Sequence, residues 1–74
     1  MKIIAVVNDN TGVICDVLKG YEHEFLSWNI VDDISVISQF GELGEDILVK
    51  IKWGNFSKLV DSRKYSFIYE EEEE

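Results

Sequence analysis

The sequence has no proline and only one cysteine, and these absences narrow the classes of protein it can belong to. A single cysteine, Cys15, cannot form an intrachain disulfide, which is typical of proteins in a reducing compartment. The first ten residues, MKIIAVVNDN, contain six apolar residues, too few for the apolar segment of a secretory signal. No run approaches the ~20 apolar residues that a membrane span needs. We therefore expect a cytoplasmic protein that does not contact membranes.

The residue types that carry catalysis or bind metals are also scarce. Cys15 and His23 are the only nucleophile and base of a suitable type, and the apolar stretch VICDV around Cys15 favours simple burial. One histidine and one cysteine cannot complete a zinc site, and the acidic turns lack the spacing of a calcium loop. The five glycines are scattered, so no phosphate-binding loop is present. We expect a protein without enzymatic activity, metal or cofactor; the rival hypothesis is a catalytic or small-ligand role for Cys15 and His23.

The sequence has few basic residues. Seven basic residues face fifteen acidic ones, and the net charge is −8. Five of the acids form the run Glu70 to Glu74; without them, ten acidic and seven basic residues remain. This charge repels the phosphates of nucleic acids and anionic membranes and favours a protein partner with a basic surface. The acidic run is interpreted either as a solvated tail that keeps the protein soluble or as a contact to that partner.

What the chain does contain is β-branched and aromatic residues in short runs between turn residues. The apolar content of 46% is too high for a disordered chain. The run ILVKIKW, residues 47–53, alternates apolar residues with lysines and predicts a half-buried antiparallel strand with Trp53 on the core side. In residues 13–20 the apolar positions are spaced as in one helical turn, and a loop folded onto the core is the alternative. The other predicted strands are residues 2–7, 21–31, 34–40, 56–60 and 65–69, with Phe67 in the core.

The order of these segments resembles the small SH3-like barrels of bacterial and phage proteins. The matching features are a first strand, an excursion that ends in LKG, the aromatic-bearing YEHEF, the strand end VKIKW before a glycine turn, and DSRKYSFI. The resemblance covers residues 2–69 and implies an all-β barrel of about five antiparallel strands as a single domain, residues 1–69, followed by the acidic tail, residues 70–74. It implies no single activity. The segment AVVND, residues 5–9, lacks the paired aromatics of SH3 peptide binders, and the acidic loops do not suit direct nucleic-acid binding.

These observations predict a non-enzymatic protein-interaction module that contacts a basic surface through acidic and aromatic side chains. If the last strand continued into the tail, alternate carboxylates would repeat every ~6.6 Å, the general scale of phosphate spacing along a nucleic-acid strand. A phage-type inhibitor that mimics nucleic acid is therefore one mode of action. The alternative is a structural or assembly subunit that self-associates through strand edges. The candidate contact residues are Trp28, Glu22, Glu24, Asp32, Asp33, Glu42, Glu45, Asp46, Glu70, Glu71 and Glu72.

Overall fold

The computed structural model describes residues 2–25 and 29–70, and this part of the chain is all-β with no helix. These residues therefore contain no helix that is long and apolar enough to cross a membrane. The strands are β1 (Ile3–Asn8), β2 (Ile14–Leu18), β3 (Ile30–Val31), β4 (Asp33–Phe40), β5 (Asp46–Trp53), β6 (Phe56–Asp61) and β7 (Tyr65–Tyr69).

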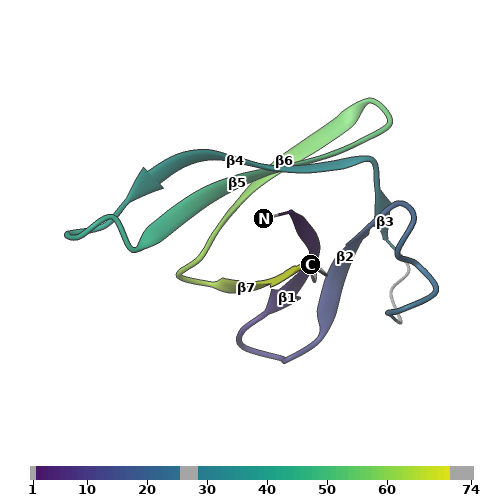
Figure 1. Ribbon diagram of the computed structural model, residues 1–74, viewed down its shortest axis with the longest axis horizontal. Coiled ribbons are helices and arrows are strands. Elements are labelled where there is room, and N and C mark those ends of the chain that lie inside the picture. The colour runs from purple at the N-terminus through teal and green to yellow at the C-terminus, as the bar shows by residue number, and fades with distance from the viewer. Residues whose placement is uncertain (1, 26–28, 71–74) are drawn as a thin grey trace, which may run out of the picture.

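The strands form two sheets, which Figure 1 shows one above the other. The four-stranded sheet has the order β3-β2-β1-β7, with β1 antiparallel to both of its neighbours and β3 parallel to β2. In β1, the four residues Ile3 to Val6 are all buried, so this strand lies at the centre of the molecule. A strand that is buried on both faces needs a near-continuous run of apolar residues, as β1 has.

The three-stranded sheet has the order β4-β5-β6 and is antiparallel throughout. Its central strand confirms the predicted alternation, because Val49 and Ile51 are fully buried while Lys50 and Lys52 are exposed. Trp53 is only partly buried; it packs against the core and stacks on Phe56, with ring centres 6.1 Å apart.

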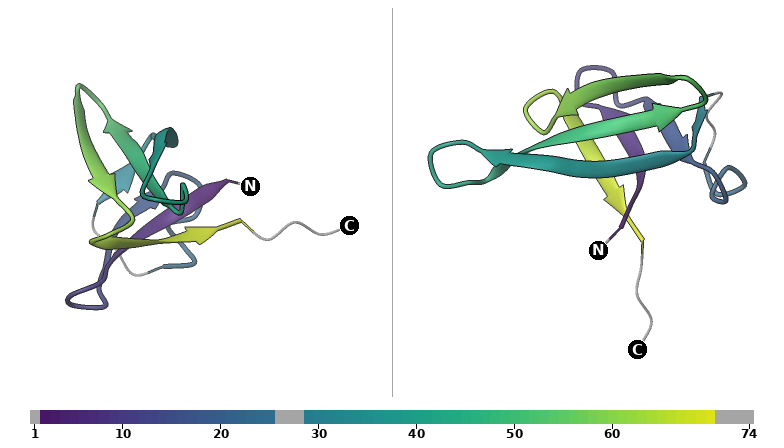
Figure 2. Two further views of the ribbon diagram at one scale, coloured as in Figure 1. Left: turned by 90° about the vertical axis from the view of Figure 1, so that its left-hand side faces the viewer. Right: turned by 90° about the horizontal axis from the view of Figure 1, so that it is seen from above.

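The chain passes between the sheets at two places. A bend at Asp32 separates β3 from β4, and the turn at residues 62–64 leads from β6 to β7. A strand that bends from one sheet into the next makes a corner between them. Figure 2 shows the three-stranded sheet crossing the four-stranded one, with the β4–β5 hairpin projecting beyond it. All-β architecture is confirmed, but the strands form two sheets and not one closed barrel.

Two sequence-based predictions are wrong in detail. Residues 14–18 are neither a helical turn nor a loop but strand β2; the spacing was misleading because Val17 and Leu18 are both buried, one on each face. Of the predicted strand at 21–31, Ile30–Val31 is a strand, residues 21–25 and 29 are not, and residues 26–28 lie outside the described part of the chain. Gly20, with φ of 104°, turns the chain, and hydrogen bonds from Tyr21 N to Leu18 O and from Glu24 N to Tyr21 O make residues 21–25 a compact turn. In that turn Tyr21 and Phe25 pack on the core, and His23 is exposed.

The remaining strand predictions are confirmed to within one residue at each end. The turn at Gly54 and Asn55 also forms as expected, as a two-residue hairpin loop that joins β5 to β6. Gly54 has φ of 55° and Asn55 does not have a positive φ, which is the pattern of a type II′ turn with glycine first. Phe67 is partly buried and packs against the core.

Candidate protein-binding surface

The predicted acidic contact residues fall into separate groups. Asp32 and Asp33 stand where β4 begins, and Glu42, Glu45 and Asp46 stand where the β4–β5 hairpin turns back. The seven β4 residues 34–40 separate the two groups, which corresponds to about 25 Å at the rise of an extended strand. In Figures 1 and 2 the 41–45 loop lies at the opposite end of the molecule from the turn that holds Glu22 and Glu24. The acids thus do not gather at one point; two of the groups flank one strand.

That strand, β4, is an edge of the three-stranded sheet. One side of it pairs with β5, and no backbone hydrogen bond joins residues 34–40 to any other part of the described chain. The pairing with β5 is interrupted by a bulge between Val36 and Ser38. An edge strand presents unpaired N–H and C=O groups on which another strand can form hydrogen bonds.

The side chains of β4 do little to block such pairing. No charged residue and no proline occurs between Ile34 and Phe40, whereas many natural edges carry lysine or proline. Val36 is 52% exposed and Ile37 is 51% exposed. Val36 pairs with the fully buried Val49, so its side chain lies on the same, core-facing side of the sheet. It is nevertheless half-exposed, because the four-stranded sheet does not extend over this position. The bulge is a protective feature of this edge.

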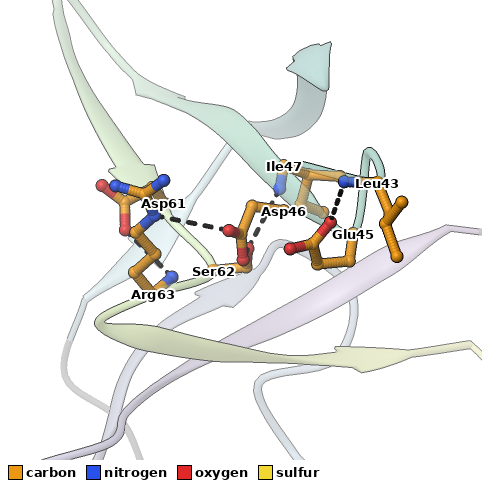
Figure 3. Close-up of polar contacts among 7 residues, drawn as sticks. All are labelled: Leu43, Glu45, Asp46, Ile47, Asp61, Ser62 and Arg63. Carbon is orange, nitrogen blue, oxygen red and sulfur yellow. Dashed lines mark hydrogen bonds and ion pairs between the residues drawn. The ribbon is translucent and has the colours of Figure 1, made fainter. Parts of the chain in front are cut away.

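The far end of the hairpin is held in place by a polar network (Figure 3). Asp46 accepts a hydrogen bond from Ser62 Oγ at 3.0 Å and pairs with Arg63 Nε at 3.3 Å. The Arg63 guanidinium also lies 4.8 Å from the ring centre of Phe40. In the loop itself, Leu43 N donates to Glu45 Oε2 at 2.8 Å. Asp46 therefore supports the hairpin, while the exposed Glu42 and Glu45 carry the negative charge of this end.

At the near end of β4, the two aspartates differ in the same way. Asp32 accepts a hydrogen bond from Gly54 N at 2.9 Å and so ties this corner to the β5–β6 turn. Asp33 is exposed and opens β4 opposite Lys52. The surface defined by residues 33–40 with Asp32, Glu42 and Glu45, here called the β4 surface, is thus apolar in the middle and acidic at both ends.

The other candidate residues lie elsewhere. Glu70 donates its N–H to Lys2 O at 2.8 Å and accepts a hydrogen bond from the Tyr21 hydroxyl, so it belongs to the end of β7. Trp28, Glu71 and Glu72 lie outside the described residues.

The pKa of Glu22 is lowered by hydrogen bonds to its carboxylate. Hydrogen bonds from its own N–H and from Gly20 N, the latter at 2.5 Å, hold the pKa of its carboxyl below the usual value. A lowered pKa in the folded state contributes stability above the unfolded-state pKa, and this is lost as the pH falls through the folded value. We expect thermal unfolding to show Glu22→Gln slightly less stable than wild type at pH 7, with the gap closing below about pH 4. A gap that widened on acidification would contradict this role.

A concave region lies between the sheets, where Asp16 of β2 meets Lys58 of β6. The Asp16 side chain is 1% exposed; Lys58 Nζ lies 2.9 Å from its Oδ2, and Asn29 Nδ2 donates to its Oδ1. Among the described residues, no donor meets Oδ2 with hydrogen-bond geometry, so the contact to Lys58 is an ion pair. Lys58 Nζ also lies 5.6 Å from the ring centre of Trp53. This pair connects the two sheets through charge.

The cleft beside this ion pair has a volume of about 580 Å³ and is lined in part by Val13, Ile14 and Cys15. The Cys15 thiol donates to Val13 O, with sulfur and oxygen 3.7 Å apart. His23 is not among the lining residues, so the cleft does not unite the suggested nucleophile and base. Within residues 2–25 and 29–70, no three His, Cys, Asp or Glu side chains form a group suited to hold a metal.

Comparison with known proteins found no relative: no family model matches the chain, and no curated protein or solved structure matches it. The choice of a candidate surface therefore depends on geometry and chemistry alone.

Sequence reasoning predicted the acidic residues but missed Val36 and Ile37 as surface residues. The segment ISVISQF was correctly predicted to be a strand, and the sequence shows that it carries no charge. Whether a strand lies at the edge of a sheet depends on its pairing with distant strands, which the sequence does not show. The Asp16–Lys58 pair was missed for the same reason, because 42 positions separate its members in a chain of 74.

Proposed function

We propose that this protein is a non-enzymatic, cytoplasmic interaction module that binds a protein with a basic surface through the β4 surface. The observation that carries the proposal is the coincidence, on one strand, of an unpaired edge, half-exposed Val36 and Ile37, and exposed carboxylates at both ends. Contiguous exposed apolar groups rimmed by polar ones are typical of interaction sites. Carboxylates at the rim would select and steer a basic partner.

Inhibition of a nucleic-acid-binding protein is one form of this function. Acidic groups about 25 Å apart could contact a groove that normally holds phosphates. In that case the captured partner would bind nucleic acid, and DNA or RNA would compete with this protein for it. We also propose that the two sheets are an open variant of the SH3-like barrel; the run from β3 into β4, which bends at Asp32 from one sheet to the other, supports this.

The partner can be captured on the immobilised full chain from a lysate of the source cells, then purified and titrated. We expect the triple variant Asp33→Asn, Glu42→Gln, Glu45→Gln to bind it about 3- to 150-fold more weakly, since each exposed charge pair contributes about 0.2–1 kcal/mol. The dissociation constant of the wild type should rise between 50 and 500 mM salt because exposed charges are screened.

The matched control combines Asp9→Asn, Glu73→Gln and Glu74→Gln, which are not among the candidate contact residues, and changes the net charge by the same amount. It should retain most of the affinity. An equal loss in both variants would show that only total charge matters, and binding unaffected by either variant or by salt would refute the proposal.

The alternative function is self-association through strand edges, and the exposed β4 edge is the observation that favours it. Antiparallel pairing of two β4 strands, however, would bring Asp33 of one copy near the Glu42 end of the other, and parallel pairing would set Asp33 beside Asp33. Like charges meet in both arrangements, which destabilises the pair. We expect light scattering to show a monomer at low salt; a stable oligomer across concentrations would favour the assembly role.

A further inference from the structure

We infer that the partner contributes a β-strand that adds to β4 and extends the three-stranded sheet to four strands. This inference rests on the proposed function and specifies how the β4 surface binds. Strand addition supplies affinity through main-chain hydrogen bonds, while alternate side chains and the ends of the strand supply specificity.

Among the four sheet edges, β4 is the one best suited to accept a strand. The edge strand β3 has only two residues. The edge strand β6 carries Lys58, which is engaged with Asp16, and β7 is followed directly by Glu70, which is bonded to Tyr21. β4 is the longest of the four, with eight residues, and has no charge between its two ends.

The bulge limits the length of the added strand. It leaves two residues of β4 opposite one of β5 and increases the local twist, so a long flat ladder cannot form along the whole edge. The bulge leaves four residues, 33–36, on one side and three, 38–40, on the other, so an added segment that avoids the bulge pairs with three or four residues, within the usual length of a strand.

The chemistry of the surface defines the segment. Its middle should hold β-branched residues, which form strands and can cover Val36 and Ile37. Its two ends should be basic, because Asp32 and Asp33 lie at one end of β4 and Glu42 and Glu45 at the other. A second copy of this chain does not meet that description, since its own β4 is acidic at both ends.

Three end-blocked peptides test the inference against the intact protein: KKTVTVKK, the charge-reversed EETVTVEE, and KKTPTPKK, which has the same charge but cannot form the ladder. Amide chemical-shift changes in a titration give both the affinity and the location. We expect KKTVTVKK to shift the amides of residues 33–40, and each of the other two peptides to bind at least about tenfold more weakly.

Equal binding of KKTPTPKK would overturn strand addition while leaving electrostatic recognition, and so the proposed function, intact. Equal binding of EETVTVEE would refute the role of the acidic ends and with it the proposed function. Shifts confined to residues outside β4 would refute the location.

Protein variants provide the second measurement. Ile37→Lys places a lysine on the edge and should weaken KKTVTVKK by at least about tenfold, as edge lysines prevent strand pairing. Leu59→Lys on β6 is the matched control, because Leu59 is 57% exposed against 51% for Ile37 and the charge change is identical. Both should unfold at temperatures close to that of the wild type. Equal loss in the two variants would show that the added charge, and not the blocked edge, weakens binding.

Discussion

Replacing Lys58 by methionine is expected to lower the free energy of unfolding by about 3 kcal/mol, because it leaves the Asp16 carboxylate buried without a counter-charge. The value lies at the low end of the usual range for broken buried pairs, since the Lys58 side chain is 38% exposed and water can partly replace it. Chemical denaturation measures the loss directly. In a domain of this size it corresponds to a fall in melting temperature of roughly 12–24 °C.

Two controls separate the ion pair from other effects of the substitution. Lys50→Met removes an exposed lysine that makes no ion pair among the described residues, and it should change stability by less than about 0.5 kcal/mol. Adding Asp16→Asn to Lys58→Met should recover about half of the loss or more, because the uncompensated charge is removed. If the double variant were as unstable as the sum of the single ones, the two side chains would not be coupled.

Ile51→Ala is the second substitution with a large expected effect, a loss of about 2–5 kcal/mol in the free energy of unfolding. Ile51 is fully buried in the central strand β5, where it pairs with Ile34 on one side and Lys58 on the other. Truncation removes apolar contacts and leaves a cavity between the sheets. A chain of 74 residues has a total stability of only roughly 4–11 kcal/mol, so this variant should be close to unfolding at 37 °C.

Leu59→Ala provides the comparison, since Leu59 lies on the neighbouring strand and is 57% exposed. Its effect should stay below about 1 kcal/mol. Urea denaturation of both variants checks the difference. Similar losses for the two would mean that the core does not lie between the sheets where the structure places it.

Local pattern predicted most of the strands because their periodicity reports their own burial. β5 is the clearest example: valine and isoleucine alternate with lysine, and the structure buries the first set and exposes the second. The same reasoning failed in β2, where Asp16, Val17 and Leu18 are consecutive and all buried. A strand covered on both faces loses its alternation, so its pattern cannot be distinguished from that of a helical turn. It also failed at Tyr21 and Phe25, where alternate aromatics pack on the core from a turn.

The candidate surface was predictable only in its chemistry. The sequence shows the charge of Asp32, Asp33, Glu42 and Glu45, and this charge is the basis for predicting a basic partner. That Asp46 instead supports the hairpin through Ser62 and Arg63 follows from contacts between residues at least 16 positions apart. The exposure of Val36 depends on how far the four-stranded sheet extends along the β4–β5 hairpin, and no local sequence pattern indicates this extent.

By itself, the sequence determined the composition of the strands, the position of the tight turns and the sign of the surface charge, because these depend on neighbouring residues. The tertiary structure alone decided which strands became edges, that the strands pair as two sheets, and that Asp16 and Lys58 meet between them. Those outcomes depend on pairing between distant segments, and in a thin core each such pairing also settles which side chains remain exposed to a partner.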